Sequence, residues 1–163
     1  MGSDPRRLDG LRADERAAAH LLEKVTGGTV RAHDVGTRQG AYDLHLTFPG
    51  GRTAAVEVTS HTTVPDDVAD LLVVPHVARR VSKVTSARGV DERHLFVTIG
   101  VGRMPDAVRL ALAGPSAPSG TESHREMQTE VPAGLSRLWL TMTERGAPLV
   151  SWSRTDGWRV HPT

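Results

Sequence analysis

The amino-acid sequence of 163 residues contains no cysteine. This absence excludes disulfide bonds and thiolate metal ligands, so a metal site would have to use histidine or carboxylate side chains. No run of about 18 apolar residues is present that could cross a bilayer, and the first residues lack the apolar stretch of a signal peptide. We therefore expect a cytoplasmic protein that has no contact with a membrane.

Neither sign of charge dominates, because 20 Lys and Arg residues are balanced by 19 Asp and Glu residues. A formal net charge of +1 argues against a strongly basic nucleic-acid module and against an acidic tail, so any basic surface must be local. Lysine is scarce, since only Lys24 and Lys83 occur. The preference for arginine, together with many Ala, Gly and Val residues, is typical of a GC-rich bacterial genome.

The hydrophobic pattern predicts one α/β (α+β) domain over residues 1–163, with the element order α-β-β-β-α-β and a β-rich tail. Gly27 and Gly28 end the first helix, and Pro75 divides the next helical segment in two. The segment 114–132 has almost no apolar residues, which is typical of a mobile loop between a core at 8–113 and a tail at 133–163. The predicted elements are a helix at 8–25, strands at 29–35, 42–48 and 53–60, helices at 66–72 and 75–87, a buried strand at 93–100, a helix at 104–114, and short tail strands containing Trp139, Trp152 and Trp158, which we expect to pack.

The hairpin within residues 42–60 carries one acid on each strand. Apolar and polar residues alternate in both strands, and a three-residue loop at 49–51 sets the pairing register. In that register Asp43 lies directly across from Glu57, on the face opposite the apolar one. Two like charges at directly opposed positions repel each other, so something must offset the repulsion.

Three offsets are physically reasonable: a proton held by one carboxyl, an arginine between the acids, or a divalent cation that accepts oxygens from both. Glu15 is a candidate third carboxylate, because it falls near the middle of the apolar stripe of the first helix, between Leu11 and Leu22. If that helix covers the carboxylate face, three acids from three elements meet. The alternative is that Asp43 and Glu57 lie on the solvated face of an ordinary antiparallel sheet.

A helix with Glu, a strand that begins with Asp, a short turn and a strand with Glu-x-Lys form the core of the PD-(D/E)XK nuclease superfamily, also called the restriction-endonuclease-like fold. The chain resembles a divergent member over residues 8–100, with Glu15, then Asp43 in AYDLHLTF and Glu57 in AAVEVTS. Its AVEVTS and RHLFVTIG segments and its Trp-rich end are also similar to small actinobacterial proteins of this type. The resemblance implies a mixed central sheet flanked by helices.

Where the family has its lysine, two residues after the acid, this chain has Thr59. In the family the lysine is thought to position the attacking water and to stabilise charge on the phosphate, which a point cation does well and a neutral hydroxyl does poorly. Some members carry the lysine on the following helix, where Lys83 or Arg80 can serve. His61, just past the end of the strand, is a further candidate, and the sequence leaves the choice open.

The resemblance implies metal-assisted hydrolysis of nucleic-acid phosphodiester bonds, in DNA repair or defence, with DNA favoured over RNA as the partner. Asp43, Glu57 and the main-chain carbonyl of Val58 would hold Mg²⁺ or Mn²⁺, with Glu15 bound directly or through water. By analogy, the protein would act as a homodimer. The residues that would hold the nucleic-acid backbone are Arg38, Arg52, Arg79, Arg80 and Lys83.

Two other functions remain compatible with the sequence. The chain can be a catalytically inactive binding or regulatory module that kept the fold and lost the chemistry with its lysine. It can also be a structural domain of a larger assembly, with the Trp-containing tail as an interface. For the basic cluster on the 75–87 helix, the alternative is a solvated helix face.

Overall fold

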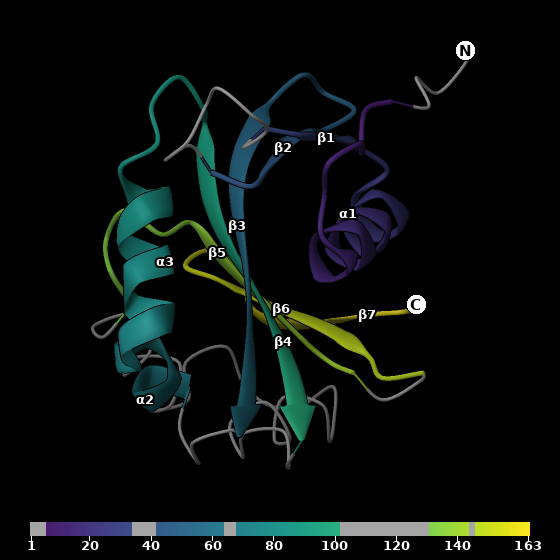
Figure 1. Ribbon diagram of the computed structural model, residues 1–163. Helices are drawn as coiled ribbons and strands as arrows, with labels where there is room; N and C mark the ends of the chain where they lie inside the picture. The colour runs from purple at the N-terminus through teal and green to yellow at the C-terminus, as the bar shows by residue number, and fades with distance from the viewer. Residues whose placement is uncertain (1–5, 34–41, 64–67, 102–130, 144–145) are drawn as a thin grey trace.

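The computed structural model describes residues 6–33, 42–63, 68–101, 131–143 and 146–163. Its architecture is an α+β fold, in which one seven-stranded mixed sheet separates helix α1 from helices α2 and α3 (Figure 1). The strands follow each other across the sheet in chain order; β3, β4 and β5 are parallel neighbours, and the other neighbours are antiparallel. The elements are α1 Ala13–Thr26, β1 Thr29–Ala32, β2 Leu44–Thr47, β3 Thr53–Thr63, α2 Val68–Val73, α3 Pro75–Thr85, β4 Glu92–Val101, β5 Arg137–Met142, β6 Leu149–Ser153 and β7 Gly157–His161.

Helix α1 begins later than predicted. Gly10 has a φ of 81°, a left-handed conformation that an α-helix does not accommodate, so the expected start at residue 8 is wrong. The predicted end is confirmed, because Gly27 is left-handed with a φ of 68° and donates its N–H to the carbonyl of Glu23 at 2.9 Å.

The predicted order of the central elements is confirmed. Three strands follow α1, and Pro75 is the first residue of α3, directly after the short helix α2. The predicted helix at 104–114, most of the loop at 114–132 and the last residues of the strand predicted at 29–35 lie outside the described residues. Within the described part of the chain, no helix has the length and apolar character needed to cross a membrane.

The three C-terminal strands continue the sheet. Strand β5 pairs in parallel with β4 from His94↔Arg137 to Ile99↔Met142, and β6 and β7 follow as antiparallel neighbours. The expected packing of tryptophans is confirmed for Trp139 and Trp152, which are buried in different cores, and Trp158 is partly buried against the core that contains Trp152.

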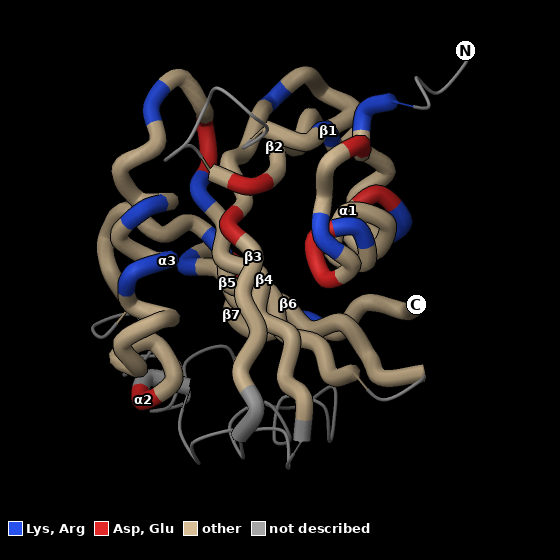
Figure 2. The backbone as a smooth tube through the Cα atoms, in the orientation of Figure 1, with Lys and Arg blue, Asp and Glu red and all other residues tan. Residues whose placement is uncertain are grey.

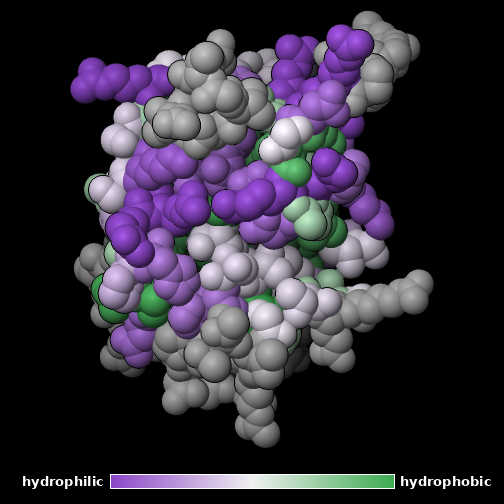
Figure 3. Space-filling view, in the orientation of Figure 1, coloured by the Kyte–Doolittle hydropathy of each residue, from purple (hydrophilic) through white to green (hydrophobic). Residues whose placement is uncertain are grey.

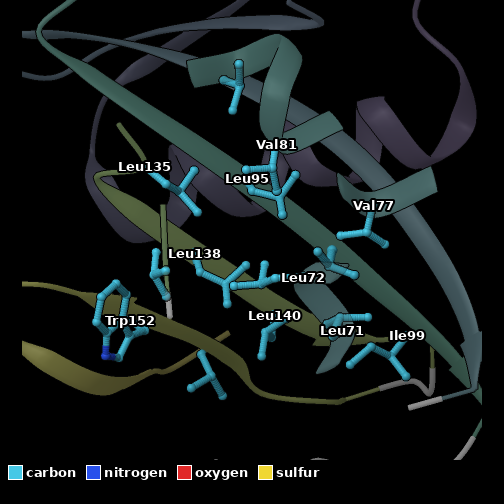
Figure 4. Packing of buried hydrophobic residues seen from close by; sticks show 14 of the residues in the cluster. Leu71, Leu72, Val77, Val81, Leu95, Ile99, Leu135, Leu138, Leu140 and Trp152 are labelled. Carbon is cyan, nitrogen blue, oxygen red and sulfur yellow. The ribbon is translucent and has the colours of Figure 1, made fainter. Parts of the chain in front are cut away.

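Apolar side chains form one core on each face of the sheet, because residues alternate in direction along every strand. On the α1 face, Leu22 packs against the apolar side of the hairpin, including Leu44 and Val56. On the other face, α2 and α3 cover β4 to β6, as Figure 4 shows for Val77, Leu95 and their neighbours. Both faces of the sheet are therefore covered, and the second face is the one that carries the polar side of the hairpin.

The connection between α1 and β1 approaches the hairpin closely at Gly28. A Cβ built there would lie 2.5 Å from the carbonyl oxygen of Thr47 and 2.9 Å from a methyl group of Leu46. We expect Gly28→Ala to lower the free energy of unfolding by about 1–3 kcal/mol, because backbone must move to admit the methyl group. Gly50→Ala is the control, since nothing lies within 4 Å of a Cβ at that position. Urea unfolding of both variants checks this, and equal stabilities would show that the contact at Gly28 is not close.

Candidate active site

The register of the β2–β3 hairpin is the predicted one. The N–H of Phe48 donates to the carbonyl of Arg52 at 2.9 Å, and Leu44 pairs with Val56. Asp43 directly precedes β2, so it stands opposite Glu57, and its Oδ2 accepts the backbone N–H of Val58 at 2.9 Å. The two acids are therefore neighbours across the hairpin.

Strand β3 is longer than its partner β2, and this difference creates the site. Strand β2 pairs with β3 only from Thr53 to Val56, whereas β3 continues to Thr63. Beyond Val56 the carboxylate of Asp43 takes over from the β2 backbone as the acceptor for Val58. Figure 2 shows the acidic positions of this region between the basic positions of α3 and the charged first turn of α1.

Glu57 points away from α1, to the face where Ala55 packs against the α2 and α3 core. Its side chain is fully buried, and Asp43 is 5% exposed. Arg80 Nη1 lies 2.5 Å and Lys83 Nζ lies 3.0 Å from Glu57 Oε1. The same two cations lie 3.9 and 3.7 Å from the carboxylate oxygens of Asp43. Two acids and two cations thus form a cluster whose charges balance.

Of the three offsets that the sequence allowed, the structure contains the arginine, with Lys83 beside it. The cluster is still incomplete, because Glu57 Oε2 is buried and has no hydrogen-bond partner. Burial raises the pKa of Glu57 and the charge of Asp43 raises it further, although the hydrogen bonds from Arg80 and Lys83 act in the opposite direction. A proton or a cation at Oε2 would satisfy an oxygen that the protein leaves without a partner.

The expected position of Glu15 is only partly correct. Its side chain is buried, as the periodicity predicted, but Oε2 accepts the backbone N–H of Arg12 at 2.9 Å and Oε1 pairs with the Arg12 guanidinium at 3.0 Å. Helix α1 packs its apolar stripe on the apolar side of the hairpin, so the helix that covers the carboxylate face is α3. Within the described ranges, no three His, Cys, Asp or Glu side chains form a metal-binding group, so the predicted meeting of three acids is wrong.

The charge of Asp43 nevertheless reaches the first turn of α1. Partial burial lowers the pKa of Arg12, but a hydrogen bond to Asp14 and the charges of Glu15, Asp14 and Asp43 together raise it above its ordinary value. The first turn of α1 is thus electrostatically coupled to the site without supplying a ligand to it.

The remaining predicted residues are distributed unevenly. Thr59 is buried and lies two residues beyond Glu57 on the same face of β3. Arg79 is exposed on α3, outside the ion pairs of the cluster. Arg52 forms an ion pair with Glu92 near the hairpin turn, at the opposite end of β2 from Asp43. Arg38 lies outside the described residues.

The sequence singled out Arg80 and Lys83 on α3, but not His76 or the polar stripe that the three residues form. His76, Arg80 and Lys83 have i, i+4 and i+7 spacing, which places them on one side of a helix, and all three contact groups of β3. The spacing was available in the sequence, but the face that this stripe meets depends on packing.

The sequence also did not reveal a buried polar group around His94, which stabilises the fold and takes no part in the candidate site. His94 is fully buried; its Nε2 lies 2.7 Å from Glu92 Oε2, and its Nδ1 lies 3.2 Å from the indole nitrogen of Trp139. Burial, with the charges of Arg137 and Arg52, lowers the pKa of His94 to about 3, so its ring is neutral at physiological pH. Both ring nitrogens have partners, which leaves neither for chemistry.

No protein-family model matches the chain, and no curated protein or solved structure shows significant similarity to it. The geometry of the site is therefore the basis for any functional conclusion.

Proposed function

We propose that the protein is a metal-dependent nuclease built on a restriction-endonuclease-like core, and that Asp43 and Glu57 are its metal ligands. The observation that carries this proposal is the convergence of two buried carboxylates from neighbouring strands, one with an unpartnered oxygen, on a lysine of the following helix. The order of elements from α1 to β4, with β3 and β4 parallel, supports the core assignment.

The residues present fit a hard divalent cation. Glu57 Oε2 is an unpartnered buried acceptor, and Asp43 lies beside it with two oxygens. Val58 presents its N–H to Asp43, and because the N–H and C=O of a strand residue point to the same side, its carbonyl faces the same edge. Oxygen ligands of this kind suit Mg²⁺ and Mn²⁺. Glu15 is left out of this ligand set, because both of its carboxylate oxygens are bound to Arg12.

The chemistry can be assigned to residues of the chain. When bound, Mg²⁺ or Mn²⁺ lowers the pKa of a water and neutralises charge on the phosphate. Lys83 replaces the lysine missing at Thr59: its ammonium lies between Asp43 and Glu57, where it can orient the attacking water and stabilise the phosphate oxygen. Arg80, which is 31% exposed, can turn its guanidinium from Glu57 to a phosphate as the substrate arrives.

The surface around the site suits a polyanion. Figure 3 shows hydrophilic side chains across the middle of this face, between α3 and α1. Exposed Arg79 and partly exposed Arg80 on α3, with Arg12 at the start of α1, offer cations for a nucleic-acid backbone. Arg52 is bound to Glu92 at the far end of the hairpin and does not belong to this group.

A second candidate is a catalytically inactive module of the same core, and one observation favours it. Arg80 and Lys83 already balance the charges of Asp43 and Glu57, so the acids do not require a cation to be stable. In that case the cluster holds α3 on the sheet, and the chain binds nucleic acid or a protein partner without cleaving it.

Cleavage assays distinguish the two candidates. The protein is incubated with plasmid DNA, single-stranded DNA and RNA in Mg²⁺ and in Mn²⁺, and initial rates are compared among variants. We expect Asp43→Asn, Glu57→Gln and Lys83→Met each to lower the rate by at least about 100-fold, since each removes a charge that acts on the metal or the phosphate. Asp70→Asn, at an exposed acid on α2, should leave the rate unchanged.

The other outcomes are equally informative. Cleavage that persists in all three site variants comes from a contaminating enzyme. Absence of cleavage in the wild type, with calorimetric Mn²⁺ binding that Glu57→Gln removes, supports the inactive module. Absence of both cleavage and metal binding overturns the metal assignment altogether.

A further inference from the structure

A second pair of polar side chains joins β3 to α3. His61 Nδ1 lies 3.4 Å from His76 Nε2, and the two ring centroids are 5.1 Å apart. His61 follows Glu57 by four residues along β3, and His76 precedes Arg80 by about one helical turn. Both side chains are partly exposed, so a solute can reach them.

A hydrogen bond explains this pair poorly. The nitrogen separation of 3.4 Å exceeds the usual range of about 2.7–3.2 Å. His76 Nε2 also lies 3.1 Å from the carbonyl oxygen of Ser60. A single N–H cannot point well at both acceptors, and when it points at the carbonyl, the lone pair of His61 Nδ1 has no donor in this pair.

We propose that His61 and His76 form a binding site for a transition-metal ion of the zinc class. Two nitrogens bound to one tetrahedral zinc ion at about 2.05 Å are separated by about 3.3 Å, close to the separation found here. The Ser60 carbonyl, already 3.1 Å from His76 Nε2, supplies a third donor atom, and water completes the coordination. To bind zinc through Nε2, neutral His76 adopts the tautomer that carries its single ring proton on Nδ1, which leaves the Nε2 lone pair for the metal.

The chemistry of the donors separates this site from the carboxylate cluster. A site with two imidazole nitrogens favours Zn²⁺, Ni²⁺ and Cu²⁺, whereas a site built only of oxygen donors favours Mg²⁺ and Mn²⁺. Burial lowers the pKa of His61 and the neighbouring His76 lowers it further, which keeps the ring neutral and its lone pair available at neutral pH. The site does not depend on nuclease activity, so the two assignments can fail separately.

Calorimetric titration of untagged protein with zinc chloride tests the proposal, with millimolar Mg²⁺ present to occupy the carboxylates. We expect one zinc ion per chain, and affinity at least about tenfold weaker in His61→Ala and in His76→Ala, because each removes one of two imidazole ligands. His20→Ala, at an exposed histidine of α1, is the control and should bind zinc as the wild type does. Equal affinity in all four proteins, or no zinc binding by the wild type at micromolar concentration, would overturn the proposal.

A second measurement needs no variant. As Ni²⁺ is added to the wild type, the imidazole NMR signals of His61 and His76 should broaden before those of the other histidines. Broadening that begins elsewhere, or equally at all histidines, also overturns the site. Circular dichroism melts of each variant show whether it remains folded, and zinc should raise the melting temperature of the wild type and of His20→Ala only.

Discussion

Replacing Arg80 and Lys83 together by methionine should lower the free energy of unfolding by about 3–5 kcal/mol at pH 7. The double substitution leaves the fully buried Glu57 carboxylate beside Asp43 without either of its cations. Breaking a buried ion pair from one side is costly, because the remaining charge stays out of water and unpaired. Urea unfolding followed by circular dichroism measures the loss.

Two controls show whether the loss belongs to the cluster. Arg79→Met removes an exposed cation from the same helix and should change stability by no more than about 0.5 kcal/mol. Adding Glu57→Leu to the double variant should recover much of the loss, because an apolar side chain needs no counter-charge. If this third substitution destabilises the protein further, Glu57 is not the group that the cations stabilise.

The same loss should depend on pH. The pKa of folded Glu57 is raised above its ordinary value of 4.5, so the folded state gains stability as pH falls from the folded pKa toward that value. Removing both cations raises the pKa of Glu57 further, so the double variant gains more stability than the wild type as pH falls. The difference in their free energies of unfolding should therefore narrow between pH 7 and pH 5. The lowered pKa of His94, about 3 in the folded protein, also makes the free energy of unfolding fall as pH falls below 6.5. This effect is the same in both proteins. A gap that stays constant would contradict the assignment.

Trp152→Ala should lower the free energy of unfolding by about 3–5 kcal/mol. The variant should still unfold as a whole, in one transition. Trp152 is fully buried on β6 and belongs to the core that Val77 of α3 and Leu95 of β4 also form (Figure 4). Removing the indole leaves a cavity that neighbouring side chains fill only in part. Circular dichroism reports secondary structure and fluorescence reports the two remaining tryptophans, and the two unfolding curves should coincide.

Trp158→Ala is the matched control. Because Trp158 is only partly buried, its replacement should lower the free energy of unfolding by less. Separate transitions for the two probes in Trp152→Ala would show that the C-terminal strands fold independently of the rest. That result would contradict the single domain predicted from the sequence.

The position of Asp43 and Glu57 was predictable, because their register depends on a short turn and on the alternation of the two strands that it joins. Both are local properties of residues 42–60. The identity of the covering helix was not predictable in the same way. The hairpin is apolar on one face, and α1 and α3 both offer a side that suits a sheet, so the choice depends on the packing of the whole molecule.

Glu15 shows the limit of periodicity as a guide. The helical wheel placed its side chain on the inner side of α1, and the side chain is indeed buried. Burial, however, has more than one cause. Glu15 is the third residue of α1, and its carboxylate satisfies the backbone N–H of Arg12, a common function of an acid in the first turn of a helix.

The C-terminal strands were expected as a tail, and their place inside the sheet was not predicted. The parallel pairing of β4 with β5 joins segments separated by more than 30 residues, and no local turn specifies it. The apolar runs around Trp139 and Trp152 indicate that these strands are buried. They do not indicate which strand each one pairs with.

The polar stripe of α3 has a mechanical consequence. His76 contacts the Ser60 carbonyl of β3, and Arg80 and Lys83, further along the same side of α3, both contact Glu57 and Asp43. Each residue advances an α-helix by about 100°, so sliding α3 by a single residue would break all three contacts together. The valines on its inner side would tolerate such a slip more easily, since one branched aliphatic group resembles the next. These polar contacts therefore fix the position of α3 along β3.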